Sequence, residues 1–597
     1  MDAQALPSRE ETVQRLMVGA DRVAHFRRDS PYTTADRLEE RARDDGDVPF
    51  ILFEDEVVTF AEANARANRI ARVAQSAGLR RGDVAALLML NRPEYILTWL
   101  GLAKIGVVTA LINTSATGTV LAHAFRQVEA KGLIVGSELA AQVADLPMDE
   151  RPGLIFEQSE TGADRSENGW RDLDTELQRV GDENLPARTR DGVVMVDPLY
   201  LIFTSGTTGL PKAARLSHLR FLSSGESMNG FMRFGEGDVH YCVLPLYHGA
   251  GGMVVPSMAL AAGRPFVLRR KFSKSGFWSD VRRHKITAVH YVGEIIRYLL
   301  TAPPRADDRD NTLRAMAGAG LRPEAWTAFR ERFGVETIFE GLGSTELSFG
   351  ISNVDNVPGS CGRIPYPEQS TTRIIRWDAE NECHLHDERG RPVQAGAGEV
   401  GEVVVKIFEG PGLQGLFEGY TSREATEAKL LRDLFEPGDC WYRSGDLVRF
   451  DEHDYFWFVD RIGDTFRWNS ENVSTQEVER VLSNYPGPTF VNVYGVEVPG
   501  SEGRAGMATL AYEEGGSFDP QTFYLHAAQH LASYAVPVFV RVTNTADMTG
   551  TYKLRKVDLK RQGYDPALCS GDPLYVADAQ AGTYQPLSAE TLARQSW

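Results

Sequence analysis

Apolar positions along the first third of the chain alternate between a helical spacing and short, strand-like runs. Residues 59–78, TFAEANARANRIARVAQSAG, carry their apolar side chains at a helical spacing and end on glycine. The run GDVAALLML at 82–90 is typical of a buried strand, and EYILTWLGLAKIG at 94–106 is helical again. This alternation spans about residues 32–143 and resumes over Pro198–Ala319. It predicts an α/β fold in which helices connect the strands of a parallel sheet.

The pattern changes in the remaining segments. Residues 144–195 are charged and poor in long apolar runs, so we expect a surface insertion there. Short strands separated by turn residues predict a β-rich subdomain at about 370–458. A chain of 597 residues exceeds one ordinary core. We therefore predict a large N-terminal domain, residues 1–460, followed by a small, mobile C-terminal α+β domain, residues 461–597.

Composition narrows the classes of function. The chain has 64 Lys and Arg against 82 Asp and Glu, a formal charge of −18. This balance argues against a protein held to nucleic acid or an anionic membrane by bulk charge, although a local basic pocket is compatible with it. The cysteines are odd in number and scattered, which argues against a disulfide framework and favours a reducing, cytoplasmic compartment. They are Cys242, Cys361, Cys383, Cys440 and Cys569.

Three further features favour a plain structural interpretation. Cys383, His384 and His386 lie close together, but one such cluster without a second ligand pair indicates a small hairpin rather than a metal site. The N-terminus has no basic start followed by an apolar run, so it does not resemble a signal peptide. The apolar stretches Leu97–Ile112 and Gly249–Gly263 are interrupted by charge, proline or glycine, which favours core elements over membrane spans.

The run LIFTSGTTGLPK is the strongest chemical signal in the chain. A short apolar strand leads directly into a loop of glycines and hydroxyls, which ends at a lysine. Glycines let the backbone turn tightly and bring N–H groups to a phosphate, while the hydroxyls and the lysine add donors and positive charge. The pattern differs from the Walker-type P-loop. The candidate phosphate-binding residues are Thr204, Ser205, Gly206, Thr207, Thr208, Gly209 and Lys212.

TSGTTGLPK resembles the signature loop of the superfamily of acyl-CoA synthetases, peptide-synthetase adenylation domains and luciferases. The strings NRPEYILTWLGLAKIG, DTFRW, ENVST, TGTYK and DPLY resemble the fatty acid transport protein and very-long-chain acyl-CoA synthetase group in particular. The likeness runs from about residue 32 to the C-terminus. It implies an AMP-forming ligase that uses ATP and Mg²⁺, with CoA as co-substrate.

The resemblance also implies roles for single residues in the N-terminal part. In VLPLYHGAG, His248 would lie between the ATP and acyl sites. In GSTE, Gly343 and Ser344 would contact the nucleotide and Thr345 its α-phosphate. Glu346 would bind magnesium, a hard cation that prefers oxygen ligands.

Further roles follow for the second half of the chain. In YRSGDL, Asp446 would accept both ribose hydroxyls, and in DRIGD, Arg461 would lie near the ribose and phosphate. Gly463 would be the hinge of the small domain, since glycine absorbs large dihedral changes. In TGTYK, Lys553 would be the adenylation lysine, a cation that stabilises charge on the transferring phosphorus.

Three departures from the group bear on the substrate and the acceptor. Leu342 takes the place of an aromatic residue expected near adenine, and it lacks a π-face. Asn469 and Ser470 replace a lysine and a glycine of RWKGENV, where the family passes the pantetheine arm close to the backbone. Leu347–Ser348 replaces Gly-Asn beside the acyl pocket.

The first hypothesis is therefore a fatty-acid or other carboxylate CoA ligase. A second keeps the adenylation but replaces CoA by an amine, or activates a small anion such as nitrite for diazotisation. A third, of another class, is a fatty-acid uptake or carrier protein. The sequence leaves the chain length of the substrate, the oligomeric state and any peripheral contact with a membrane open.

Overall fold

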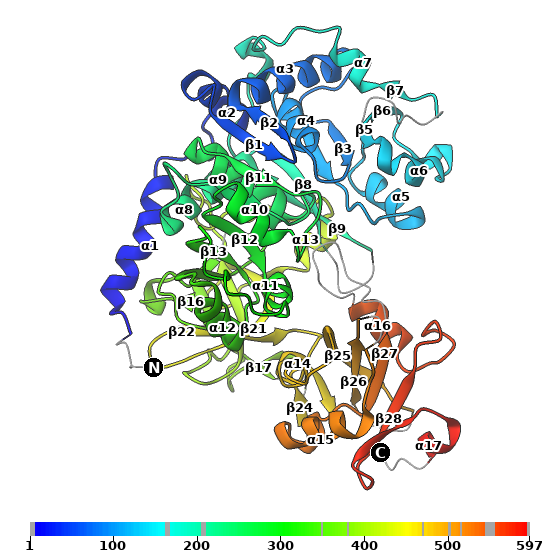
Figure 1. Ribbon diagram of the computed structural model, residues 1–597. Helices are drawn as coiled ribbons and strands as arrows, with labels where there is room; N and C mark the ends of the chain where they lie inside the picture. Colours follow the sequence, from blue (N-terminus) through cyan, green and yellow to red (C-terminus); the bar gives the residue numbers. More distant parts are fainter. Residues whose placement is uncertain are drawn as a thin grey trace. The chain divides into compact units, whose positions relative to one another are not determined.

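The structure is a computed structural model that describes residues 6–160, 168–204, 210–347, 350–378, 381–468, 471–499, 503–513, 516–543 and 556–593. The chain divides into two compact units (Figure 1). The first comprises Met1–Thr371, Val405–Arg432 and Gly438–Tyr442. The second comprises Thr372–Val404, Asp433–Pro437 and Arg443–Trp597.

The first sheet of the first unit has the strand order β7-β6-β5-β3-β4-β8-β9, in which all neighbours are parallel except β8 and β9. This confirms the predicted parallel α/β architecture. The strands are β3 (Val84–Leu88), β4 (Val108–Leu111), β5 (Gly132–Gly136), β6 (Leu154–Gln158), β7 (Arg171–Asp172), β8 (Pro198–Thr204) and β9 (Lys212–Ser217). Connecting and flanking helices are α3 (Phe60–Ser76), α4 (Pro93–Ala103), α5 (Gly118–Gln127), α6 (Ala140–Ala144) and α7 (Leu173–Leu177).

Helices α3 and α4 form where the spacing predicts them. Thr59 caps α3 in a reciprocal capping box with Glu62, which satisfies two free N–H groups of the first turn. The two helices pack so closely that a Cβ added to Gly101 of α4 would lie 2.7 Å from the carbonyl oxygen of Ala67 of α3. Trp99 on the inner side of α4 meets the rings of Tyr200 and Phe221 in edge-on contacts that fill the core beneath the sheet.

The expected surface insertion at 144–195 is wrong in part. Residues Leu154–Gln158 form β6, which pairs in parallel with β5 over its whole length. Phe156 of this strand is buried in the main core. The apolar run LIF is only three residues long, so the surrounding charged residues hid a buried strand from the periodicity.

The second sheet of the first unit has the order β15-β14-β13-β12-β10-β11-β1-β2. Its strands are β1 (Pro49–Phe53), β2 (Glu56–Thr59), β10 (His240–Cys242), β11 (Phe266–Leu268), β12 (Ala288–Val292), β13 (Ala315–Ala319), β14 (Thr337–Gly343) and β15 (Gly350–Ser352). Its helices are α8 (His218–Met232), α9 (Val255–Ala262), α10 (Phe277–Arg283), α11 (Gly293–Leu300) and α12 (Pro323–Phe333). The strands β11, β10, β12, β13 and β14 are parallel, so their carboxyl ends meet at one edge.

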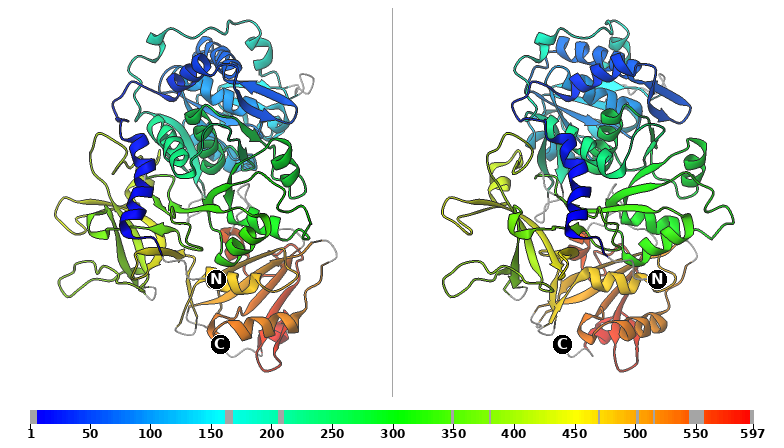
Figure 2. Two further views of the ribbon diagram at one scale, coloured as in Figure 1. Left: turned by 60° about the vertical axis from the view of Figure 1, so that its left-hand side comes forward. Right: turned by 90° about the vertical axis from the view of Figure 1, so that its left-hand side faces the viewer.

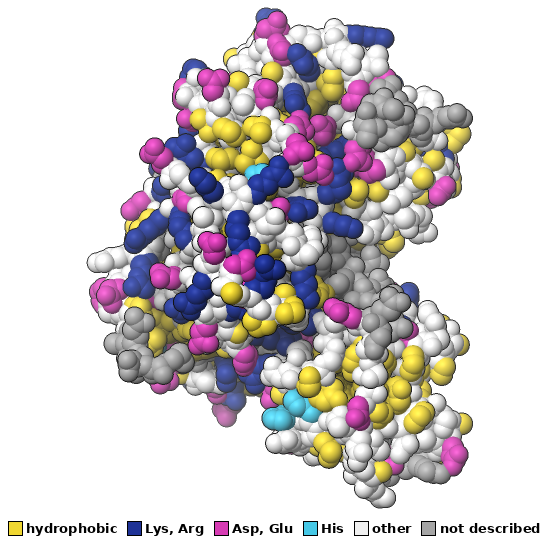
Figure 3. Space-filling view, in the orientation of Figure 1, with side chains coloured by type: hydrophobic (Ala, Val, Ile, Leu, Met, Phe, Trp, Pro, Cys, Tyr) yellow, Lys and Arg dark blue, Asp and Glu magenta, His cyan; other side chains and the backbone are white. Residues whose placement is uncertain are grey.

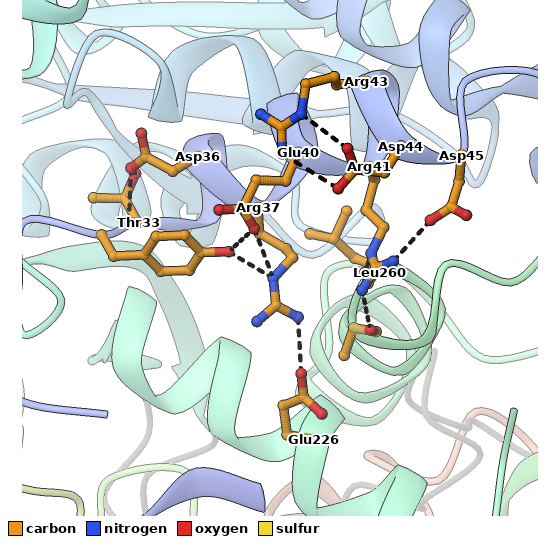
Figure 4. Close-up of polar contacts among 12 residues, drawn as sticks. Thr33, Asp36, Arg37, Glu40, Arg41, Arg43, Asp44, Asp45, Glu226 and Leu260 are labelled. Atoms are coloured by element: carbon orange, nitrogen blue, oxygen red, sulfur yellow. Dashed lines mark hydrogen bonds and ion pairs between the residues drawn. The ribbon is translucent and has the colours of Figure 1, made fainter. Parts of the chain in front are cut away.

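Helix α8 is fixed on several sides within this unit. Helix α1 (Arg9–Val23) packs along α8, as Figure 2 shows, and the two backbones approach at glycines: a Cβ on Gly230 would lie 2.9 Å from the carbonyl oxygen of Val18. Helix α2 (Thr34–Asp44) reaches α8 through Arg37, whose guanidinium donates to Glu226 at 2.8 Å (Figure 4). Arg22 of α1 pairs with the same carboxylate at 3.0 Å. Glu226 therefore ties α1 and α2 to one point of α8.

The second unit holds the β-rich segment and the C-terminal fold. Its elements before residue 462 are β17 (Thr372–Asp378), β18 (Cys383–His384) and β22 (Tyr455–Arg461), while β19 (Gly401–Lys406) and β21 (Cys440–Phe450) have residues in both units. The C-terminal sheet has the order β25-β26-β27-β28-β29. Its elements are β25 (Phe490–Glu497), β26 (Arg504–Ala511), β27 (Phe539–Thr543), β28 (Leu574–Asp578) and β29 (Thr583–Pro586), with helices α14 (Thr475–Ser483), α15 (Pro520–His530), α16 (Lys556–Gln562) and α17 (Ala589–Ala593).

Residues 466–584 supply a separate hydrophobic core, built of side chains from Phe466 to Tyr584. The compact units, however, divide the chain at other residues than 460, because the second unit also includes Thr372–Val404 and Arg443–Asp460. The domain boundary at residue 460 therefore stays a prediction.

Among the described residues, no helix has the length and apolar character that crossing a bilayer requires. On the face shown in Figure 3, acidic and basic side chains are interspersed over the first unit.

Candidate active site

The ends of the predicted phosphate-binding loop lie opposite each other on β8 and β9. Thr204 and Lys212 are paired in register on these antiparallel strands, and Thr204 Oγ1 donates to the carbonyl oxygen of Lys212 at 3.4 Å. Thr204 is the last residue of β8 and so lies at the carboxyl end of this strand, the edge where parallel sheets bind ligands. Residues Ser205, Gly206, Thr207, Thr208 and Gly209 lie outside the described residues, and their phosphate contacts stay predictions.

The GSTE segment follows β14 directly and buries its carboxylate. Gly343 ends the strand, and Glu346 is 7% exposed. The hydroxyl of Tyr420 donates to Glu346 Oε1, and the hydroxyl of Tyr442 lies 3.4 Å from Oε2 and 3.0 Å from Ser344 Oγ. Burial, followed by the Glu346 charge, raises the pKa of the Tyr420 hydroxyl, so it remains a protonated donor. The carboxylate is thus held by two neutral groups.

This environment fits a magnesium ion. Mg²⁺ is usually bound by one or two carboxylates together with substrate phosphates. Glu346 supplies one such carboxylate, and the described residues contain no group of three or more His, Cys, Asp or Glu side chains arranged for a metal. At such a site the phosphates of a nucleotide would supply further oxygen ligands to the ion.

The backbone of this segment is bound by an arginine and a glutamate that sequence reasoning missed. Arg220 of α8 donates to the carbonyl oxygens of Ser344 and Thr345, and it pairs with Glu418. Neither residue belongs to a motif that the sequence singles out. Tyr442, in contrast, is the first residue of YRSGDL, so that motif offered a signal.

His248 lies where the chain makes an unusually tight turn. It precedes a π-helical turn, Gly249–Val254, and its Nδ1 is 3.4 Å from the backbone N–H of Ala250. A Cβ on Gly252 would lie 1.9 Å from the carbonyl oxygen of Leu246, so this close approach requires glycine. Burial, followed by the charge of His248, lowers the pKa of His290 on β12 to about 4. His290 is the central residue of β12.

Glu340 of β14 ties the ends of three parallel strands together. Its carboxylate accepts from the Tyr291 hydroxyl at 2.7 Å and from the backbone N–H groups of Leu321 and Gly320 at 2.8 and 3.1 Å. Burial raises the pKa of this carboxyl to about 7, against the effect of the three donors. Two residues further on, Leu342 pairs in register with Ile351 of β15.

The second unit brings Asp446 and Arg461 together. They are paired in register on β21 and β22, and Arg461 Nε lies 3.2 Å from Asp446 Oδ1. Asp446 is 5% exposed, whereas the Arg461 side chain is 60% exposed. Gly463 follows with φ +86°, and its carbonyl oxygen accepts from Lys560 Nζ at 2.7 Å. The predicted hinge glycine thus has a left-handed conformation that other residues rarely adopt.

The other predicted residues of this part fall outside the described residues. They are Asn469, Ser470 and Lys553. The first described residue after the lysine motif is Lys556, whose Nζ lies 2.8 Å from Thr475 Oγ1 and 3.0 Å from Glu479 Oε1. Helix α16 is therefore anchored to α14 directly after the segment that carries the predicted catalytic lysine.

The hairpin predicted around Cys383 is present. Strands β17 and β18 pair Trp377 with His384, and His384 Nε2 lies 2.7 Å from Glu402, which Arg443 also contacts. His384 is accounted for by this buried carboxylate.

These features define a class of protein. A glycine- and hydroxyl-rich sequence follows the parallel strand β8, and a buried carboxylate follows β14 of the second sheet; both features are expected of an enzyme that binds a nucleotide. The comparisons agree: the model of the AMP-binding enzyme family matches residues 38–421. The chain belongs to the family of AMP-binding enzymes.

Relatives and solved structures are consistent with this assignment. The chain is similar to long-chain fatty acid transport protein 2 of Rattus norvegicus, with 38% identity over 92% of this chain and 88% of the relative. It is 36% identical to the medium/long-chain-fatty-acid–CoA ligase FadD6 of Mycobacterium tuberculosis, over 93% of this chain and 89% of that protein. Its fold resembles ATP-bound MatB from Rhodopseudomonas palustris, with TM-score 0.73 and 22% identity over 89% of this chain and 99% of that one.

The comparisons confirm the predicted superfamily, the fold class and the chemistry. The chain is an AMP-forming ligase that activates an acid with ATP. The large α/β part with its smaller C-terminal fold matches the architecture of the benzoate CoA ligase from Burkholderia xenovorans LB400, with TM-score 0.71 and 20% identity over 89% of this chain and 100% of that one.

Proposed function

We propose that the chain is a fatty-acid–CoA ligase. It forms an acyl adenylate from a fatty acid and ATP, releases pyrophosphate, and then transfers the acyl group to CoA. The observation that carries the proposal is the buried Glu346, held by two tyrosine hydroxyls beside the end of β14. The similarity to the fatty-acid–CoA ligase FadD6 over most of both chains supports the substrate class.

In the first step, a carboxylate oxygen of the acid attacks the α-phosphorus of ATP in line, and the bond to the β-phosphate bridging oxygen breaks. Bound Mg²⁺ would supply positive charge to the phosphate oxygens, with Glu346 as its protein ligand. The chain contributes position and charge: Thr345 would contact the α-phosphate, and Lys553 would stabilise the transferring group. Asp446 would hold the ribose through its two oxygens.

In the second step, the CoA sulfur attacks the acyl carbon, AMP leaves, and the thiol proton passes to solvent or a base. The proposal includes rotation of the C-terminal domain about Gly463 between the two steps. The left-handed φ of this glycine, with no atom within 4 Å of a Cβ built on it, supports a hinge role.

The deciding experiment measures pyrophosphate release from ATP and Mg²⁺ with short, medium and long fatty acids, aryl acids and nitrite. Each acid is tested with and without CoA, and with and without an arylamine. Turnover of fatty acids that requires CoA supports the proposal. Turnover only with a small anion and an amine supports the second candidate instead.

That second candidate keeps the adenylation and replaces the thioester step, as in diazotisation with nitrite. It is favoured by Asn469 and Ser470 in place of the lysine and glycine at the pantetheine tunnel, and by Leu347–Ser348 in place of Gly-Asn beside the acyl pocket. CoA-dependent release of AMP by the pure protein would rule it out. A carrier role, the third candidate, would require fatty-acid uptake that persists in a variant unable to bind ATP.

The proposal includes a cytoplasmic enzyme without nucleic-acid partners. The five cysteines are all free thiols in the described structure, which suits a reducing compartment. The acidic balance of the chain disfavours polyanionic partners.

A further inference from the structure

The buried ion pair Arg220–Glu418 contacts the backbone of Ser344–Glu346, the segment that carries the proposed metal ligand. Arg220 is 8% exposed and lies in the first turn of α8, where Ser217 caps the helix by accepting from the Arg220 N–H. Its guanidinium donates to the carbonyl oxygen of Thr345 at 2.6 Å and to that of Ser344 at 3.1 Å. Two consecutive carbonyls just before Glu346 are thereby fixed to one rigid, planar group.

The partner of this arginine holds the same segment from the other side. The Glu418 side chain is 6% exposed and lies 3.3 Å from Arg220, and it also accepts from the Ser217 N–H at 2.9 Å. The backbone N–H of Glu418 donates to the carbonyl oxygen of Glu346 at 3.1 Å. The Arg220–Glu418 pair thus contacts the backbone of three successive residues, Ser344 to Glu346.

The helix that carries the arginine cannot easily shift. Glu226, further along α8, is tied to Arg37 of α2 (Figure 4). It also pairs with Arg22 of α1. A Cβ on Gly225 would lie 2.3 Å from the carbonyl oxygen of Ser257, so α8 and α9 are in backbone contact. The Arg220 guanidinium therefore extends from a helix, α8, that its neighbours hold in place.

We propose that the Arg220–Glu418 pair is a positioning device: it sets the backbone of Ser344–Glu346 so that the Glu346 carboxylate meets the magnesium of bound ATP. Neither residue touches substrate in this assignment. A buried ion pair adds little net stability compared with apolar residues of the same volume, so its placement on this segment points to geometry rather than to stability. The inference rests on the proposed function.

The chain offers a matched control in the same unit. Arg332 pairs with Asp308 at 2.7 Å, with side chains that are 15% and 9% exposed. Like Arg220, it donates to backbone carbonyls, here those of Leu300, Ala302 and Pro303. It therefore reproduces the chemistry of the pair at a segment without a predicted functional residue.

The test compares Arg220→Lys with Arg332→Lys by calorimetric titration of ATP, with and without Mg²⁺ and with no acid present. Lysine keeps the charge but loses the fork that reaches two carbonyls. We expect Arg220→Lys to reduce the Mg²⁺-dependent gain in ATP affinity by about tenfold or more, because small displacements of a positioned group have large effects. Arg332→Lys should leave this gain unchanged, while both variants lower the melting temperature.

Glu418→Gln provides a second route, since it conserves volume and the backbone N–H that reaches Glu346. It should reduce the same gain, by less than Arg220→Lys does. An unchanged gain in a folded Arg220→Lys or Glu418→Gln variant would overturn the proposal, as would an equal loss in Arg332→Lys. Because no acid is present, failure to find an acid substrate would count against the proposed function and leave this test intact.

Discussion

The two carboxylates predicted to hold ATP differ in what holds them. Glu346, in the first unit, is bound by two tyrosine hydroxyls, and its backbone is gripped by a buried ion pair. Asp446, in the second unit, faces Arg461, whose side chain is 60% exposed. Exposed ion pairs contribute about 0–1 kcal/mol, so ribose hydroxyls can displace Arg461 at little cost. The predicted metal ligand is therefore held in place before a nucleotide binds, whereas the contact between the predicted ribose ligand and Arg461 can be exchanged.

The largest expected effect on activity comes from Lys553, which belongs neither to the contacts of Glu346 nor to those of Asp446. Lys553→Ala should abolish adenylation, by about 10³-fold or more, because it removes the charge that the transition state needs. ATP binding should stay nearly unchanged. Pyrophosphate release and calorimetric ATP titration measure the two quantities on the same protein. An active variant would overturn the assignment of this lysine.

Glu346→Gln tests whether the predicted metal ligand of the first unit needs its negative charge. The amide oxygen still accepts from Tyr420, but the negative charge is lost, so we expect about a 10²-fold loss of ATP-dependent pyrophosphate release. Affinity for ATP without Mg²⁺ should hardly change. If the wild type and the variant have equal rates at limiting Mg²⁺, Glu346 is not the metal ligand.

Asp446→Asn tests the predicted contact between Asp446 of the second unit and the ribose of ATP. A hydrogen bond to a charged acceptor contributes about 1.5–3 kcal/mol, so the Kd for ATP should rise by roughly 10–100-fold. Arg461→Ala is the companion variant, and it should change the free energy of unfolding by less than about 1 kcal/mol. Equal losses of ATP affinity in both variants would show that the pair acts as a unit.

Gly463→Ala has a smaller effect, confined to the proposed hinge. Nothing lies within 4 Å of the added Cβ, so the cost comes from the left-handed φ of +86° alone. We expect a loss of about 1 kcal/mol in unfolding free energy, with thioester formation slowed more than adenylation. Chemical denaturation and separate assays of the two steps measure this. Parallel slowing of both steps would contradict a hinge role.

Glu340→Gln should change only the pH dependence of stability. Burial raises the pKa of this carboxyl from 4.5 to about 7, so the folded protein favours its neutral form. Its contribution to the unfolding free energy is full below pH 4.5 and falls as pH rises toward 7, by up to about 1 kcal/mol per pH unit. The variant should lack this slope in urea denaturation between about pH 5 and pH 7. If the variant keeps the slope of the wild type, the raised pKa of Glu340 is not the cause of the pH dependence.

Local patterns predicted much of the fold. The helical spacing over 59–78, which ends on a glycine, predicted α3, and the apolar run at 82–90 predicted β3. Strand β6 was not predicted, because a short buried strand with few apolar residues shows no clear hydrophobic periodicity when charged segments surround it. Prediction from spacing is therefore strongest for long elements with one buried face.

The candidate site was predictable only where a motif carries it. GSTE and YRSGDL identified Glu346 and Asp446 as residues to examine, although not what binds them. Arg220 and Glu418 gave no signal, because a lone charged residue is most often solvated on the surface. Only the folded chain brings these two side chains together at 3.3 Å, and their role depends on that contact.

The contact of the Arg220–Glu418 pair with the Ser344–Glu346 backbone has a consequence for the nascent chain. Arg220 and Glu418 are separated by 198 positions, and the Ser344–Glu346 segment lies between them in the sequence. At roughly 5–20 residues per second, a ribosome needs on the order of 10–40 s to add the second partner after the first. During that time Arg220 lacks its counter-charge, and burial of an unpaired charge is costly, so closure of the first unit over Arg220 is disfavoured until Glu418 has left the ribosome. Synthesis itself thus delays the completion of the nucleotide site until both halves of the pair exist.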